Sequence, residues 1–169
     1  MNRLNADQRH IVRFTLNGED VEGLAHPRML LSDFLRHEIG ATGTHVGCEH
    51  GVCGACTVRI DGEPSRACLA LAVQTHGAVV ESVEGLAPSP GQLSVLQEAF
   101  QRNFALQCGF CTTGILMSLD WLLTREADAS EDRIREVLSG HLCRCTGYAP
   151  IVAAAIEARD ILKGEAEHV

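Results

Sequence analysis

Long hydrophobic runs, a signal segment and basic stripes are all missing from this sequence. No apolar run approaches the roughly 20 residues that a helix needs to cross a bilayer, so no membrane span is expected. The first stretch, MNRLNADQRH, lacks the apolar core of a secretory signal. The net charge is −8 at pH 7, and an acidic chain without a basic stripe is a poor candidate for binding nucleic acid. We therefore expect a cytoplasmic protein with no nucleic-acid partner.

Cysteine, by contrast, is abundant. The chain has 169 residues, 46% of them hydrophobic, which suits one ordinary domain or two small ones with real cores. In a reducing compartment, clustered cysteines indicate metal ligation or redox chemistry rather than disulfides. The eight cysteines fall into a first quartet, Cys48, Cys53, Cys56 and Cys68, and a second quartet, Cys108, Cys111, Cys143 and Cys145.

The first half of the chain has the pattern of a small mixed sheet with a helix across it. Asn17-Gly18 and Asp61-Gly62 are signals for tight turns between strands. Apolar residues recur at helical spacing over residues 29–39. The expected strands cover residues 11–16, 20–25, 57–60 and 78–83.

The second half changes to a helical period. Residues 84–94, EGLAPSPGQLS, contain two prolines and two glycines and are expected to form a linker. Ser130 is predicted to cap the third of four helices, and Pro150 to occupy the first position of the fourth. Each helix is predicted to bury one apolar stripe: Leu93, Leu96, Phe100 and Phe104; Ile115, Leu116, Leu119, Leu122 and Leu123; Ile134, Val137 and Leu138; and Ile151, Val152, Ala155, Ile156 and Leu162.

These patterns predict an α+β protein with two domains. The first, residues 10–85, is a sheet domain. The second, residues 92–163, is an all-α four-helix bundle.

The spacing of the first quartet is informative by itself. Its gaps are four, two and eleven residues within and after GCEHGVCGACTV, which is the plant-type pattern for a 2Fe–2S ferredoxin cluster. Three thiolates from one loop must converge on a small inorganic core. Gly47, Gly51 and Gly54 permit the tight turns and the close approach of backbone N–H groups that such a core requires.

The second quartet leaves more alternatives open. Its gaps are two, thirty-one and one residues, and each pair can lie just before a helix, where N–H groups favour anionic sulfur. Zinc also accepts four thiolates with one C-x2-C half, although a C-x-C half is unusual for it. The spacing favours two iron–sulfur clusters. Disulfides and two zinc sites remain the alternatives.

With both quartets considered together, the chain resembles a known family. GCEHGVCGACTV followed by Cys68, then QCGFCTTG, then HLCRCTGY, are similar to the iron–sulfur small subunit of the molybdenum hydroxylases, the superfamily of xanthine oxidase and bacterial carbon monoxide dehydrogenase. The resemblance covers roughly residues 10–163. One departure is Thr113, where the family usually has proline, and we expect it to be tolerated.

The resemblance implies a β-grasp ferredoxin-like domain and a four-helix domain, each with one 2Fe–2S cluster ligated by its own quartet. It implies a large partner subunit that holds the molybdenum–pterin cofactor and a medium subunit that holds FAD, assembled as a dimer of heterotrimers. It further implies that the amide of Gln107 binds the pterin, that Cys145 is the ligand closest to it, and that the second cluster lies next to the molybdenum centre.

The predicted function is therefore electron transfer from a molybdenum–pterin centre, through two clusters, toward FAD or another acceptor. The substrate reacts in a partner subunit, and this chain is expected to supply no catalytic residue. A stand-alone ferredoxin and a zinc-binding interaction module are the alternatives. Arg144 and Tyr148 are interpreted as structural. His50 is interpreted as an exposed loop residue, and His45 and His141 likewise as loop residues without a function.

Overall fold

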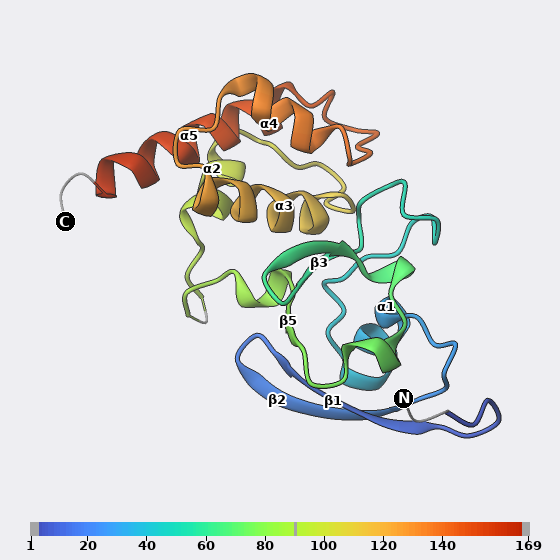
Figure 1. The fold of residues 1–169 in the computed structure, drawn as a ribbon. Helices are drawn as coiled ribbons and strands as arrows, with labels where there is room; N and C mark the ends of the chain where they lie inside the picture. Colours follow the sequence, from blue (N-terminus) through green and yellow to red (C-terminus); the bar gives the residue numbers. More distant parts are fainter. Residues whose placement is uncertain (1–3, 90, 167–169) are drawn as a thin grey trace.

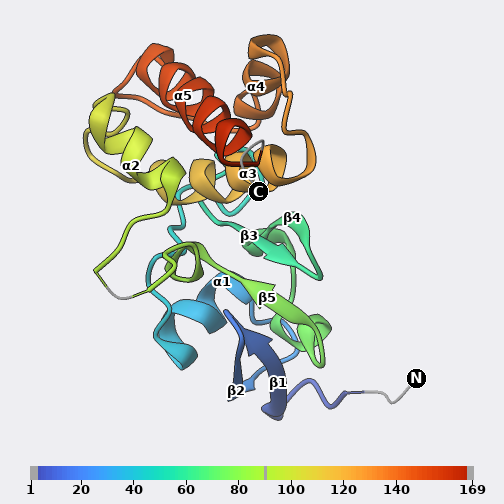
Figure 2. The same cartoon turned by 90° about the vertical axis from the view of Figure 1, so that its left-hand side faces the viewer.

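The computed structural model describes residues 4–89 and 91–166, in which the two halves of the chain form two stacked bodies. Figure 1 shows the strands in the lower body and the longer helices in the upper one, with helix α3 (Thr112–Arg125) lying next to strand β3 (Thr57–Ile60). Figure 2, a quarter turn away, shows the same separation. Each body has its own apolar core.

The lower body contains a five-stranded mixed sheet with the order β2-β1-β5-β3-β4. Neighbouring strands are antiparallel, except that β1 and β5 run parallel. Both predicted turns are present. Asn17 and Gly18 have φ values of 50° and 87°, and Asp61 and Gly62 have φ values of 51° and 83°, the positive angles that two-residue hairpin turns need. The strands other than β3 are β1 (His10–Leu16), β2 (Glu19–Ala25), β4 (Glu63–Arg66) and β5 (Val79–Glu81).

The last strand covers fewer residues than the predicted 78–83, because the backbone and side chain of Ser82 bond to the Asn17 side chain and not to a neighbouring strand. Asn17 Oδ1 accepts from Ser82 N at 2.8 Å, and Asn17 Nδ2 donates to Ser82 Oγ at 2.9 Å. The backbone beyond β5 (Val79–Glu81) is thereby fixed to the first hairpin, and it turns away from the sheet.

The segment predicted as one helix over residues 29–39 is a short α-helical turn, α1 (Leu31–Asp33), followed by a π-helical segment, Phe34–Ile39. The looser π turns still bury both Phe34 and Leu35 against the sheet. Gly23 makes room for the first of these, since a Cβ on Gly23 would lie 2.7 Å from Phe34 Cζ. The apolar spacing located the segment but did not distinguish the two helix types.

Four helices share the core of the upper body: α2 (Val95–Arg102), α3, α4 (Glu131–Leu138) and α5 (Ala149–Ala166). Ser130 caps α4 as predicted, because its Oγ accepts from Arg133 N at 3.2 Å. Ser94 caps α2 in the same way, at 3.3 Å from Gln97 N. Pro150 is the second rather than the first residue of α5. In the predicted linker, residue 90 lies outside the described residues.

The first apolar stripe is partly wrong. Phe104 is 82% exposed, because α2 ends at Arg102 and the positive φ of Phe104, 50°, turns it out of the helical register. Leu93 precedes the helix and is 44% exposed. Leu162, near the end of α5, is also at the surface.

Polar contacts join the two bodies. The Arg59 guanidinium on β3 lies 2.6 Å from an Asp120 carboxylate oxygen on α3 and 3.0 Å from Glu81 on β5. Only 14% of the Arg59 side chain is exposed, so this ion pair is better shielded from water than an ordinary surface pair. Within the described part of the chain, no helix is long and apolar enough to cross a membrane.

Candidate metal centres

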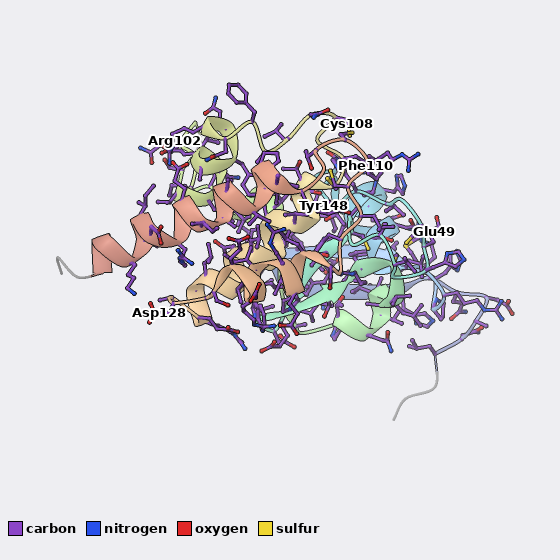
Figure 3. All side chains as sticks on the ribbon, turned by 90° about the horizontal axis from the view of Figure 1, so that it is seen from above. Glu49, Arg102, Cys108, Phe110, Asp128 and Tyr148 are labelled. Carbon is purple, nitrogen blue, oxygen red and sulfur yellow. The ribbon has the colours of Figure 1, made fainter. Side chains whose placement is uncertain are left out.

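The loops that carry the two cysteine quartets meet at the boundary between the bodies. Leu142 N, next to Cys143, donates to the carbonyl oxygen of Cys53 at 2.9 Å. The His45 ring stacks on Phe110 with centroids 5.0 Å apart, and its Nδ1 lies 2.9 Å from Phe110 O. Figure 3 shows Cys108, Phe110, Tyr148 and Glu49 on one side of the molecule, away from Asp128 and Arg102.

Two glycines make this approach possible. A Cβ on Gly114, near the start of α3, would lie 2.1 Å from Gly54 O. A Cβ on Gly54, in the first cysteine loop, would lie 2.4 Å from His141 Nδ1 and 2.7 Å from Gly140 O. Thr113, at the position of the family's usual proline, adds a long hydrogen bond of 3.4 Å from its hydroxyl to Ala55 O.

In the first quartet, backbone N–H groups point at sulfur. Cys48 Sγ accepts from Cys53 N and from His50 N, each at 3.4 Å. These two N–H groups, Cys53 first, lower the pKa of the Cys48 thiol to about 6, so the thiolate that a metal binds is favoured there. Burial raises the pKa of Cys56 to about 11, and its sulfur contacts that of Cys68.

In the second quartet, Cys111 directly precedes α3, as predicted, whereas three residues separate Cys145 from α5. The sulfurs of Cys108 and Cys145 are 3.5 Å apart, and Cys111 contacts Cys143. Burial raises the pKa of Cys111 to about 12. The N–H of Phe110 is the main cause of the lowered pKa of the Cys108 thiol.

The four thiol groups of each quartet fit a small sulfide-bridged iron core. None of the eight cysteines, all of which lie in the described residues, forms a disulfide. Among residues 4–89 and 91–166, no three His, Cys, Asp or Glu side chains are grouped to hold a single metal ion. Side chains instead interact in pairs, among them Cys56 with Cys68, Cys111 with Cys143, and Cys108 with Cys145. A 2Fe–2S core needs one pair of thiolates for each of its irons. Gly47 leaves space beside the Cys53 sulfur, because a Cβ on Gly47 would lie 3.3 Å from Cys53 Sγ and would reduce the room inside the cysteine loop.

One residue near the quartets was misjudged from the sequence. His141 is 2% exposed, and its Nε2 lies 2.8 Å from Ser118 Oγ. Its Nδ1 has no hydrogen-bond partner and faces Gly54. Burial, aided by the charge of Arg66, lowers the pKa of His141 to about 4, so the ring is neutral at pH 7 and packs between the two loops. Its position two residues before Cys143 was the only signal in the sequence, and it did not predict burial.

The residues expected at the pterin lie at the surface. Gln107, Cys108 and Cys145 are all exposed, so a partner subunit can reach them. His50 is exposed, as expected, and His45 is half-buried by its stacking on Phe110.

Comparison with known proteins agrees with this geometry. Residues 14–78 match the family model described as a 2Fe-2S iron-sulfur cluster binding domain, and residues 82–156 match the one described as a 2Fe-2S binding domain. The gamma subunit of caffeine dehydrogenase from Pseudomonas sp. (strain CBB1) is 55% identical over 148 residues, which cover 86% of this chain and 88% of the relative. The chain belongs to the iron–sulfur small subunits of the molybdenum hydroxylases.

Two further relatives agree with this membership. The nicotine 6-hydroxylase small subunit of Paenarthrobacter nicotinovorans is 50% identical over 143 residues, covering 85% of this chain and 86% of the relative. A chain of the crystal structure of quinoline 2-oxidoreductase from Pseudomonas putida 86 superposes with a TM-score of 0.89 at 46% identity, covering 94% of this chain and 98% of that one.

As a member of this family, the chain is an electron-transfer subunit of an oxidoreductase and carries two 2Fe–2S clusters. In multisubunit molybdenum hydroxylases the molybdenum–pterin cofactor and FAD belong to partner subunits. The clusters supply one-electron redox chemistry when bound. The cysteine thiolates, N–H donors and packing described above would hold them.

Proposed function

We propose that the first quartet holds one 2Fe–2S cluster in a β-grasp domain, residues 10–85, and the second quartet holds the other in a four-helix-bundle domain, residues 92–163. The observation that carries this proposal is the contact between the two loops, Leu142 N to Cys53 O at 2.9 Å. Loops that touch through backbone place their bound groups close together, which suits transfer of single electrons from one to the other.

The sulfur contacts also suggest which thiolates share an iron. Within the first quartet the contacts pair Cys48 with Cys53 and Cys56 with Cys68. Within the second quartet they pair Cys108 with Cys145 and Cys111 with Cys143. We assign each of these four pairs to one iron.

The exposed residues at and beside the second quartet suggest the direction of electron flow. Gln107, Cys108 and Cys145 are exposed together, and we propose that they face the pterin of the large subunit. The Gln107 amide can both donate and accept, which suits a pterin edge. The first quartet then passes electrons toward a FAD-binding medium subunit. The assembly we propose is a dimer of such heterotrimers in the cytoplasm.

Two cysteine variants test the ligand assignment in the purified complex. Cys108→Ser should remove one of two EPR signals of the dithionite-reduced protein, together with turnover, while the other signal persists. Cys48→Ser is the matched control and should remove the other signal. Two intact signals in either variant would contradict the assignment.

The two alternative functions make opposite predictions in simple measurements. A stand-alone ferredoxin would elute alone from gel filtration of native material with full carrier activity. A zinc module would be colourless and would contain zinc in place of iron. We expect instead a red-brown protein that co-elutes with larger subunits and contains two irons for each of its two clusters.

The names of several relatives suggest the substrate class of the complex. The relatives include subunits of a caffeine dehydrogenase, a nicotine hydroxylase and a nicotinate dehydrogenase, and the similar structure is a quinoline oxidoreductase. We propose that the molybdenum subunit hydroxylates an N-heteroaromatic ring. Turnover of the purified complex with quinoline, nicotinate and caffeine should exceed turnover with simple aldehydes, and a preference for aldehydes would refute this.

A further inference from the structure

The short turn after the second quartet wraps back onto one of its cysteines. Thr146 Oγ1 lies 3.0 Å from Cys143 Sγ, and the N–H of Tyr148 donates to the same Oγ1 at 3.2 Å. The Tyr148 hydroxyl in turn accepts from Cys143 N at 2.8 Å and donates to His141 O at 3.0 Å. One threonine and one tyrosine thus hold both the sulfur and the amide of Cys143.

The direction of the sulfur contact follows from the state of the thiol. A cysteine that binds metal is a thiolate, which can only accept a hydrogen bond. The Tyr148 N–H already occupies one lone pair of Thr146 Oγ1. The hydroxyl hydrogen of Thr146 is therefore the donor, and it points at the sulfur of Cys143.

The backbone around the turn keeps this donor in place. Tyr148 has a φ of 68°, a left-handed angle that is unfavourable for a residue with a side chain. The two hydrogen bonds of its hydroxyl hold it there, immediately before α5, whose early N–H at Val152 bonds to Tyr148 O at 2.9 Å.

We propose that Thr146 is a positioning residue that sets the reduction potential of the second-quartet cluster by donating a hydrogen bond to the Cys143 thiolate. Reduction adds negative charge to the cluster and its thiolates, so a donor to sulfur stabilises the reduced form and raises the potential. The inference rests on the proposed function, because it requires Cys143 to be a cluster ligand.

Redox titration of the complete complex, followed by EPR, tests this inference. The signal that disappears in Cys108→Ser identifies the second-quartet cluster. Its midpoint potential should fall in Thr146→Val, which keeps the shape but removes the hydroxyl, and return toward the wild-type value in Thr146→Ser. Thr124→Val is the matched control, because the Thr124 hydroxyl donates to the Asp120 carbonyl, at 2.7 Å, on the exposed side of α3 and away from both quartets. The first cluster should keep its potential throughout.

The outcomes separate the inference from the function beneath it. An unchanged second potential in Thr146→Val, with both signals present, overturns the inference and leaves the ligand assignment standing. A wild-type complex with a single signal, or with too little iron for two clusters, overturns the proposed function itself. If Thr146→Val loses the second signal, the comparison of Thr146→Ala with Thr146→Ser tests the hydroxyl instead. Equal potentials in these two variants refute the role of the hydroxyl. A lower potential in Thr146→Ala than in Thr146→Ser supports it.

Discussion

Replacing Gly114 with alanine tests the packing that joins the two cysteine loops. The new Cβ would lie 2.1 Å from Gly54 O and 3.0 Å from Ala55 O, whereas real Cβ contacts essentially never fall below 3.0 Å. Both neighbours are backbone atoms and cannot rotate away. The start of α3 and the first cysteine loop must therefore separate by roughly 1 Å, a backbone shift of the kind that overpacking forces.

Two opposing effects set the size of the loss. Overpacking costs about 1–3 kcal/mol, and the upper end applies here because backbone faces backbone. Alanine is favoured over glycine inside a helix by about 1 kcal/mol at most. The net loss is about 2 kcal/mol, which corresponds to a fall in Tm of about 4–8 °C for a chain of this length.

Thermal unfolding of the cluster-loaded protein measures the change, followed by circular dichroism and by bleaching of the visible absorbance at one scan rate, since cluster loss is irreversible. Gly164→Ala in α5 is the matched control, because among the described residues no atom outside its chain neighbours and its own helix backbone would lie within 4 Å of the added Cβ. The control should gain up to about 1 kcal/mol from helix propensity. A Gly114→Ala protein as stable as wild type would refute the argument that the loops meet through this glycine.

Three further predictions follow from side-chain contacts. Arg59→Ala leaves the Asp120 and Glu81 carboxylates without their partner and should cost about 1–2 kcal/mol in urea unfolding. Arg135→Ala, which removes an exposed ion pair, is the control and should cost less than about 0.5 kcal/mol. Equal losses in the two variants would count against an inter-domain role of Arg59. Ser130→Ala removes the cap of α4 and should cost about 1 kcal/mol, with Ser130→Asp restoring it in the same assay. The Arg102 hydrogen bond lowers the pKa of Glu157, so this carboxylate contributes stability above its ordinary pKa of about 4.3 that is lost as pH falls through the lowered value. Glu157→Gln should therefore flatten the acid limb of a plot of stability against pH, and an unchanged slope would contradict this.

The elements predicted well were those with local causes. Asn-Gly and Asp-Gly turns require only the positive φ that these residues tolerate, and both turns are present. The apolar stripe of α3 is buried as expected, because a helix with so many apolar positions is covered whatever its neighbours are. Ser130 acts on the N–H of a residue three positions away, so its cap could be recognised from sequence.

The elements predicted wrongly depended on where a helix stops or on what packs against it. Phe104 continues the apolar period of α2, but the helix has already ended, and the residue is exposed. The segment Phe34–Ile39 has the apolar positions of an α-helix and takes π turns instead. His141 was interpreted as a loop residue, yet packing between two distant segments buries it.

The sequence by itself determined the number of cysteine quartets, the family and the order of the two domains, because ligand spacing and turn chemistry act within one short stretch of chain. Only the tertiary structure decided that the loops touch from Cys53 O to Leu142 N and that Gly54 and Gly114 allow this approach. The physical reason is that such contacts depend on how two separate apolar cores pack against each other. The residues that meet there are far apart along the chain, and no local pattern encodes their distance.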